Sequence, residues 1–421
     1  MGLFKTSILN GIAVLIKMLT MFVLNKILAI YVGPAGYTII GQFQNFIQMV
    51  TSFSGSAINT GIIKYTAEYY DSPRKQKLIW QTAGSLIFIL SIIFSILILI
   101  FKESLSNYIF KSSEYQSVFI WLAIFLIFFN FNTFFLAILN GKKEIVKLIT
   151  ANILGSLFSL IITSFLAIQY NLYGALIALS IYQSVVFVIT FTLCLKSSWF
   201  KINYLFGKIN KKIAKNLSSF VLMALVSAIC VPLSQITIRY YLMSEYSLDY
   251  AGYWEAMTRL STAYLMFVTT TLGVYYLPRF AELQQIDKIK NEVYRGYKFI
   301  LPLTLCTGLA IYVLRDFVIK LLFSESFLPM EKLFLWQMIG DSLKIGSWIL
   351  SYLMLSKAMT KTFIITEIVF ALNSILLTIL GNIFFGFEGV SIAYMVNYAL
   401  YWAVMAKFIF RTLNSQRIKY E

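Results

Sequence analysis

The sequence predicts an all-α polytopic membrane protein with about 12 transmembrane helices in two parallel six-helix repeats. Its 421 residues are 59% hydrophobic and only 13% charged, whereas soluble domains carry about 25% charged residues. The apolar residues form runs of about 20, the length that crosses a hydrocarbon core about 30 Å thick. Because lipid offers the backbone no hydrogen-bond partners, such runs fold as helices. No stretch of domain size has a soluble composition, which excludes a soluble domain on a single anchor.

The cysteines and the absence of histidine exclude several kinds of chemistry. Cys194, Cys230 and Cys306 lie in apolar surroundings without paired spacing, which indicates packing residues rather than a disulfide framework or a zinc site. The chain contains no histidine, so metal sites, nucleophile pairs and proton relays built on histidine are excluded. We therefore expect no metal and no cofactor. The apolar run from Lys5 to Val32 is too long for a cleavable signal and is interpreted as the first retained helix.

Hydrophobic runs place six spans in each half of the chain. The first-half spans are expected at 6–32, 37–66, 78–101, 117–140, 145–169 and 174–195. The second-half spans are expected at 216–243, 250–278, 297–317, 333–356, 362–385 and 388–410. An even number of spans puts both termini on the same side of the membrane.

The basic residues indicate which side that is. They concentrate at the chain ends and in every second loop, for example Arg74, Lys75, Lys142, Lys143, Lys211, Lys212, Lys288, Lys290, Arg411 and Lys419. The alternate loops hold few, namely Lys102, Lys111, Arg239, Arg315, Lys320 and Lys332. The positive-inside tendency therefore predicts that both termini are cytoplasmic. The net charge of +17 is explained by these loops, and it favours attraction to anionic lipid headgroups over nucleic-acid binding.

The second half of the chain repeats the first at an offset of 215 or 216 residues. Ala35-Gly36-Tyr37 matches Ala251-Gly252-Tyr253, and Gly174-Ala175 matches Gly389-Val390. Gly141-Lys142 falls close to Ser356-Lys357-Ala358. An even helix count per half makes the repeats parallel, an arrangement that transporters use for two lobes around a central site. The predicted parts are an N-terminal six-helix lobe at 1–200, a basic cytoplasmic linker at 201–215, a C-terminal six-helix lobe at 216–410 and a cytoplasmic tail at 411–421.

Ionisable residues inside the predicted spans are the candidates for function, because each costs about 2.5–3.5 kcal/mol at a helix centre. They are Lys17, Lys26, Glu255, Arg259, Asp341, Lys344 and Glu367. Glu255 and Arg259 share a helix face, as do Asp341 and Lys344. Two interpretations stay open: structural ion pairs with lysines that snorkel to an interface, or side chains that line a polar cavity. The first half contains lysines but no central carboxylate, which favours an anionic ligand such as a phosphate.

Several segments resemble the Wzx-type flippases of the multidrug/oligosaccharidyl-lipid/polysaccharide exporter superfamily. The resemblance is carried by Val32-Gly33-Pro34-Ala35-Gly36, Ile63-Lys64-Tyr65, Tyr312-Val313-Leu314-Arg315-Asp316-Phe317 and Leu335-Trp336-Gln337-Met338-Ile339-Gly340-Asp341-Ser342-Leu343-Lys344. It extends over essentially the whole chain and is strongest to translocases of O-antigen or enterobacterial common antigen repeat units.

The resemblance implies a transporter of undecaprenyl pyrophosphate bearing a short oligosaccharide. The substrate would move from the cytoplasmic to the periplasmic leaflet of the bacterial inner membrane by alternating access, with other polysaccharide-assembly membrane proteins as partners. We expect Lys17, Lys26, Arg259 and Lys344 to attract the diphosphate. Glu255, Asp341 and Glu367 would tune those cations, contact sugars or couple transport to a proton or sodium gradient.

Alternative functions are distinguished by features that this chain lacks. A drug or organic-cation antiporter of the same superfamily would place a carboxylate in the first-lobe core, where this chain has Lys17. A major-facilitator transporter would carry a Gly-rich Asp-Arg loop where this chain has Tyr70-Asp71-Ser72-Pro73-Arg74-Lys75. A polysaccharide polymerase or ligase would have a long external loop with catalytic basic residues, and no such loop is predicted.

Overall fold

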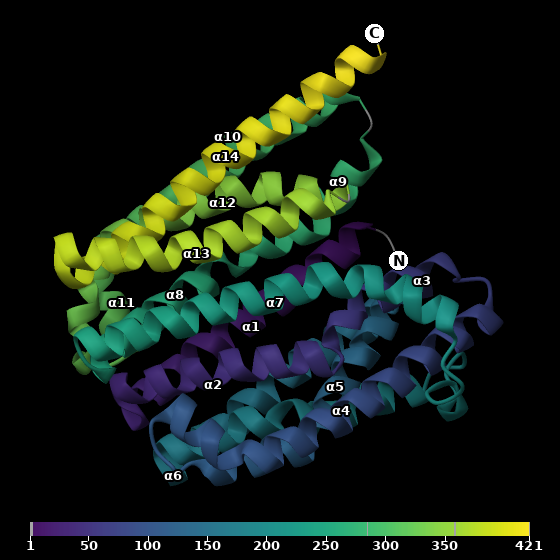
Figure 1. Cartoon of the computed structure of the whole chain (residues 1–421), viewed down its shortest axis with the longest axis horizontal. Coiled ribbons are helices and arrows are strands. Elements are labelled where there is room, and N and C mark those ends of the chain that lie inside the picture. The colour runs from purple at the N-terminus through teal and green to yellow at the C-terminus, as the bar shows by residue number, and fades with distance from the viewer. Residues whose placement is uncertain (1–2, 284, 358, 421) are drawn as a thin grey trace. The chain divides into compact units, whose positions relative to one another are not determined.

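The computed structural model describes residues 3–283, 285–357 and 359–420, which form helices and turns without a strand (Figure 1). Ala358 lies outside these described residues. The helices of the first half are α1 (Leu3–Tyr31), α2 (Gly33–Ser54), α3 (Asn59–Glu68), α4 (Pro73–Phe110), α5 (Gln116–Gly141) and α6 (Ile145–Leu195). Those of the second half are α7 (Lys211–Glu245), α8 (Leu248–Thr271), α9 (Leu277–Glu282), α10 (Ile286–Val313), α11 (Arg315–Leu322), α12 (Phe334–Ser356), α13 (Thr360–Phe385) and α14 (Gly389–Tyr420).

These helices confirm the predicted all-α polytopic fold. The second span of each half is interrupted: α2 and α3 are separated by η1 (Ser56–Ile58), and α8 and α9 by a π-helical turn, η3 (Leu272–Tyr276). The fifth and sixth spans of the first half run together as α6, which is broken at Tyr170 and Asn171. The expected span at 297–317 differs at its end, because α10 stops at Val313 and Arg315 opens the separate helix α11.

Within the described residues, seven stretches are long and apolar enough to cross a membrane. Two of them are 51 and 50 residues long, more than twice the length that one span needs. The helices α2, α8 and α12 are not among these stretches. These are helices that carry buried amide or charged side chains, including Gln42, Asn45, Glu255 and Asp341.

The internal repeat is visible in the backbone. Tyr170 and Asn171 have φ/ψ of −129°/15° and 50°/−130°. Phe385 and Gly386, 215 residues later, have −122°/7° and 61°/−147°. Positive φ is tolerated by glycine and, among other residues, mainly by asparagine and aspartate. The two halves therefore make the same turn between their last two helices.

A second turn repeats at the same offset, after α5 and after α12. The Glu144 amide donates to the Leu139 carbonyl, and the Met359 amide donates to the Met354 carbonyl, both at 3.0 Å. Lys142 Nζ donates to Gln76 Oε1 at 3.2 Å, and the equivalent Lys357 Nζ donates to a backbone carbonyl at the end of α9. Burial lowers the pKa of both lysines. Each lysine thus ties its turn to a neighbouring helix of the same half.

The chain forms two compact units, Met1–Pro232 and Leu233–Glu421, hereafter unit 1 and unit 2. In unit 1, α5 packs against α3, α4 and α6, and α1 packs against α6. In unit 2, α12 packs against α8, α9, α10 and α14, and α13 packs against α14 (Figure 1). Pro232 lies inside α7, so this helix belongs to both units. The predicted lobe and linker boundaries remain a prediction.

The segment between α6 and α7 is held against α4. The Leu205 side chain is buried in the core of unit 1, and a Cβ on Gly84 would come within 2.1 Å of the Leu205 carbonyl oxygen. Ser85 Oγ donates to the Gly207 carbonyl at 3.0 Å, and the Asn210 amide donates to Thr82 Oγ1 at 3.2 Å. This segment is therefore a packed strap rather than a loose connection.

Candidate functional site

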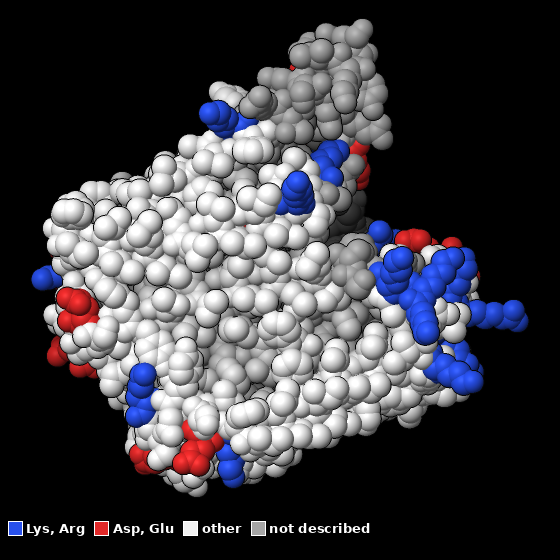
Figure 2. All heavy atoms as spheres, viewed as in Figure 1, with Lys and Arg blue, Asp and Glu red and all other residues white. Residues whose placement is uncertain are grey.

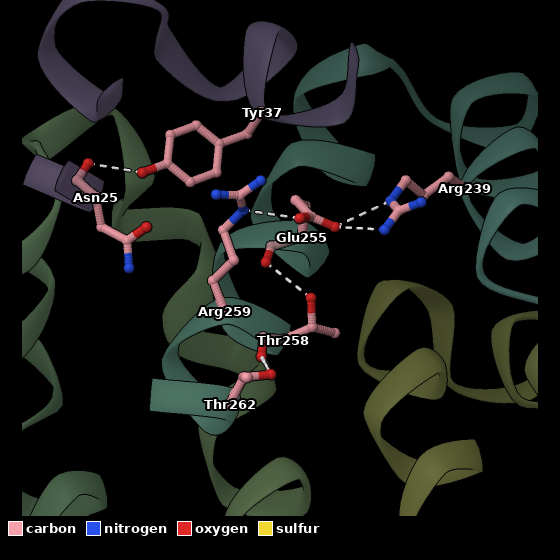
Figure 3. Close-up of polar contacts among 7 residues, drawn as sticks. All are labelled: Asn25, Tyr37, Arg239, Glu255, Thr258, Arg259 and Thr262. Carbon is pink, nitrogen blue, oxygen red and sulfur yellow. Dashed lines mark hydrogen bonds and ion pairs between the residues drawn. The ribbon is translucent and has the colours of Figure 1, made fainter. Parts of the chain in front are cut away.

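Two arginines converge on one buried carboxylate in unit 2 (Figure 3). Glu255, on α8, accepts a hydrogen bond at Oε1 from Arg259 Nε at 2.8 Å. Its other oxygen, Oε2, accepts from Nε of Arg239 at 3.1 Å and also from Nη2 of the same side chain. The three side chains carry a net charge of +1, because two guanidinium groups share one carboxylate.

Local geometry explains how these side chains meet. Glu255 and Arg259 are four residues apart on α8, so they lie on one helix face. Arg239 comes from α7, which precedes α8 with only Tyr246 and Ser247 between them. The Arg239 guanidinium also lies 5.5 Å from the Trp254 ring centroid, where a cation–π contact is favourable.

The structure confirms the sequence-predicted contact between Glu255 and Arg259 and corrects the position of Arg239. The distribution of basic residues assigned Arg239 to an external loop, but it lies inside α7 with its side chain only 2% exposed. Arg259 is more accessible, at 13% exposed. Arg239 therefore neutralises Glu255 from within the protein, while the Arg259 side chain reaches solvent-accessible surface.

A second polar cluster surrounds Asp341, which is fully buried on α12. Its Oδ2 accepts from the Tyr264 hydroxyl of α8, and its Oδ1 accepts from the Tyr394 hydroxyl of α14, both at 2.7 Å. One turn earlier on α12, Gln337 Nε2 donates to Ser261 Oγ at 3.1 Å. The carboxylate is thus bound by hydroxyl donors from two neighbouring helices, an arrangement that stabilises a buried charge.

Lys344 is surrounded by aromatic rings rather than bound directly to Asp341. Its Nζ lies 5.0, 5.7 and 5.5 Å from the ring centroids of Trp348, Tyr394 and Tyr398. The described residues contain no direct ion pair between Asp341 and Lys344, which the spacing on α12 had suggested. An aromatic cage of this kind holds a cation by the ring faces.

Three predicted residues remain, Glu367 in unit 2 and Lys17 and Lys26 in unit 1. Glu367 is half-buried on α13, close enough to Tyr398 and Tyr401 of α14 to interact with them electrostatically. In unit 1, Lys17 on α1 is exposed. Lys26 is half-buried and follows Asn25, whose backbone carbonyl accepts a hydrogen bond from the Tyr37 hydroxyl at 2.6 Å (Figure 3).

The polar clusters have no charged counterparts in the first half. At the offset of 216 that matches Ala35-Gly36-Tyr37 to Ala251-Gly252-Tyr253, the positions of Glu255 and Arg259 correspond to Ile39 and Phe43. At the offset of 215 that holds later in each half, Asp341 corresponds to Leu126. The helical scaffold is therefore duplicated, while these buried charges belong to unit 2 alone.

The fold and these clusters define the chain as a polytopic membrane transporter of the two-repeat type. Its fold is similar to that of an inward-facing multidrug resistance MATE family transporter of the MOP superfamily, with a TM-score of 0.77 and 13% identity over 95% of each chain. It is also similar to lipid II flippase MurJ in an inward closed conformation, with a TM-score of 0.71 and 16% identity over 96% of this chain and 87% of that one.

Residues 3–284 match the family model described as polysaccharide biosynthesis protein, and the chain belongs to this family. It is 28% identical over 408 residues to proteins named lipid III flippase from Escherichia coli (strain K12) and Shigella flexneri. Each alignment covers 96% of this chain and 97% of the relative.

Proposed function

We propose that this protein is a flippase for lipid-linked oligosaccharides. It moves undecaprenyl-pyrophosphate-linked repeat units from the cytoplasmic to the periplasmic leaflet by alternating access, for the synthesis of a polysaccharide such as O-antigen or enterobacterial common antigen. The observation that carries this proposal is the end-to-end similarity to lipid III flippases, at 28% identity over 96% of the chain. The protein is a transporter in this proposal, and no enzymatic step is assigned to it.

Physical chemistry supports a protein pathway for such a substrate. A diphosphate and its sugars cannot enter hydrocarbon without a large desolvation cost, whereas an apolar polyprenyl tail can stay in the hydrocarbon. Arginine recognises phosphate oxygens through a planar fork of donors. The net positive charge around Arg259 and the caged cation of Lys344 supply this chemistry in unit 2, and Lys17 and Lys26 supply further cations on α1.

A leaflet-specific glycan assay tests the function. Cells that lack the protein should retain completed lipid-linked repeat units on the cytoplasmic side of the membrane. A polymerase or ligase would give the opposite pattern, with completed but unpolymerised units on the outer side. Finding the units outside in the absence of the protein would contradict the proposal. Efflux of organic cations without any glycan defect would favour the antiporter alternative.

Energy coupling through a buried carboxylate forms part of the proposal. Asp341, Glu367 and Glu255 are the candidate carriers of a proton or sodium ion. Both carboxylate oxygens of Glu255 are bound by arginine side chains, which leaves little room for a sodium ion. Asp341 is held by two neutral hydroxyls, which makes it the stronger candidate.

Replacing Asp341 with asparagine should abolish the response of transport to an imposed proton or sodium gradient. The amide keeps the size of the side chain, and we expect a stability loss of about 1–2 kcal/mol from weaker hydrogen bonds to Tyr264 and Tyr394. Transport into proteoliposomes with and without each gradient measures the effect. Asp316→Asn on α11, where the side chain is 64% exposed, is the matched control. A gradient response that survives in Asp341→Asn excludes Asp341 as the carrier.

The proposed location is the bacterial inner membrane, with both termini in the cytoplasm. The proposed partners are anionic lipids at the basic loops and other membrane proteins of polysaccharide assembly. The loop charges support this orientation through the positive-inside tendency. Cysteine labelling of an introduced Lys201→Cys from either side of the membrane would test it, because Lys201 is exposed and lies in the basic strap.

A further inference from the structure

A cavity of about 170 Å³ lies at the basic end of unit 1. It is formed where the end of α3, the first turns of α4 and the start of α7 come together. Its lining residues are Tyr65, Tyr69, Lys75, Leu78, Ile79, Lys212 and Ile213. Pockets for whole drug-sized ligands are about 300–1,000 Å³, so this cavity fits a headgroup rather than a complete small molecule.

The cavity combines positive charge with an aromatic wall. Tyr65 and Tyr69 stack with ring centroids 6.2 Å apart and an interplanar angle of 11°. Lys75 Nζ lies 4.8 Å from the Tyr69 ring centroid, and Lys212 adds a second cation from α7. None of the described residues that line the cavity is acidic. The Glu68 carboxylate nearby raises the pKa of Tyr69 above its ordinary value.

The strap between α6 and α7 preorganises the cavity before a ligand binds. Asn210 Oδ1 accepts hydrogen bonds from the backbone amides of Lys212 and Ile213, at 3.0 and 3.2 Å, and so caps α7. The Asn210 amide is itself bound to Thr82 of α4. Lys212 is therefore held beside α4. Binding of a ligand between Lys212 and Lys75 then costs little conformational entropy of the backbone.

The position and lining of the cavity identify the class of ligand. Lysines and aromatic side chains lie at the ends of membrane-crossing helices, at the level of lipid headgroups. Figure 2 shows that Lys and Arg side chains gather at the end of the molecule where Figure 1 places α3. Five of the seven lining residues are aromatic or aliphatic, and Leu78 is 43% exposed. Such a lining suits a phosphate attached to an apolar body better than a free ion.

We propose that this cavity binds the phosphate of an anionic membrane lipid between Lys75 and Lys212, with the lipid backbone against Tyr65, Tyr69 and Leu78. The site lies within unit 1, whereas the Arg259 and Asp341 clusters belong to unit 2. Basic pockets between transmembrane helices are a recurring way of holding such headgroups. This proposal concerns the binding of a lipid, and it does not depend on whether the protein transports a substrate.

The test compares two charge-matched double variants of the full-length protein. Lys75→Gln/Lys212→Gln removes both cations of the cavity, whereas Lys201→Gln/Lys208→Gln removes two exposed lysines of the strap that do not line it. Native mass spectrometry after exchange into phosphatidylglycerol–phosphatidylcholine nanodiscs measures how much anionic lipid each protein retains. We expect retention to fall about tenfold or more in the cavity variant, because it loses both direct charge-assisted contacts with the lipid phosphate. The strap variant should match the parent protein.

A third variant and a second lipid make the result specific. Ile213→Trp fills the cavity without changing charge, and it should also reduce retention. Adding polyprenyl phosphate distinguishes the source of the phosphate: displacement of phosphatidylglycerol identifies a polyprenyl carrier, and no displacement identifies a bulk phospholipid. Equal losses in the cavity and strap variants, or no loss in either, would overturn the proposal. Failure of the glycan assay would leave these binding measurements unaffected, so the two proposals are tested separately.

Discussion

Replacing Glu255 with glutamine should lower the free energy of unfolding by about 3 kcal/mol, because breaking a buried ion pair typically costs about 3–5 kcal/mol. The substitution keeps the shape of the side chain but removes the negative charge that both the Arg239 and the Arg259 guanidinium groups contact. Arg239 is the more severe case, since its side chain is only 2% exposed and cannot reach water. Equilibrium unfolding in mixed micelles measures the change.

Two further variants separate this effect from a general loss of charge. Glu282→Gln removes a carboxylate that is 70% exposed and faces Arg279 at 3.6 Å, so we expect a change below about 1 kcal/mol. Combining Glu255→Gln with Arg239→Gln removes one of the two excess cations and should recover part of the lost stability. A Glu255→Gln protein as stable as Glu282→Gln would mean that the cluster does not stabilise unit 2.

The helical plan was predictable because lipid imposes a strong rule on sequence. A span must be apolar for about 20 residues and must satisfy its own backbone, so hydropathy alone located α1, α5 and α13 well. The interruptions in the second span of each half were not predictable. The π-helical turn at Leu272–Tyr276 packs against α12, as do α8 and α9 on either side of it, and hydropathy does not report packing.

Part of the polar site could be predicted from the sequence, because helix periodicity brings some of its residues together. Glu255 and Arg259 are neighbours on one helix, and a period of 3.6 residues brings them together whatever the tertiary structure. Arg239 joins them only through the pairing of α7 with α8, and Tyr264 and Tyr394 reach Asp341 from two other helices. A basic residue near the end of a span resembles a loop residue in composition, which is why Arg239 was misplaced. A buried carboxylate at Glu255 needs more partners than Arg259 alone supplies. This need was the signal that could have located Arg239.

The asymmetry between halves links structure to the proposed transport. The turns after α5 and α12, and the breaks at Asn171 and Gly386, repeat at an offset of 215 residues. The charged residues Glu255, Arg259 and Asp341 do not repeat. Scaffold geometry is thus retained in both halves, while the charged side chains of Glu255, Arg259 and Asp341 occur in one. The two arginines around Glu255 can therefore be tested separately for stability and for transport.

Arg259→Gln should lower transport of the lipid-linked substrate about tenfold or more at subsaturating concentration. A hydrogen bond to a charged group contributes about 1.5–3 kcal/mol, and each 1.4 kcal/mol corresponds to a factor of ten. Stability should change less than in Glu255→Gln, because Arg239 continues to neutralise Glu255 through Nε and Nη2. Initial rates in proteoliposomes, measured together with unfolding in mixed micelles, separate the two effects.

Arg239→Gln is the matched comparison, since it removes the same charge from the same carboxylate. Its side chain is buried against Trp254, so we expect a loss of stability with substrate affinity retained in the folded fraction. Arg259→Lys should recover part of the transport, because an ammonium keeps the charge but not the forked geometry that matches phosphate. Normal transport by a folded Arg259→Gln protein would exclude Arg259 from substrate binding. Equal transport losses in Arg239→Gln and Arg259→Gln, scaled to folded protein, would indicate that the cluster acts through structure alone.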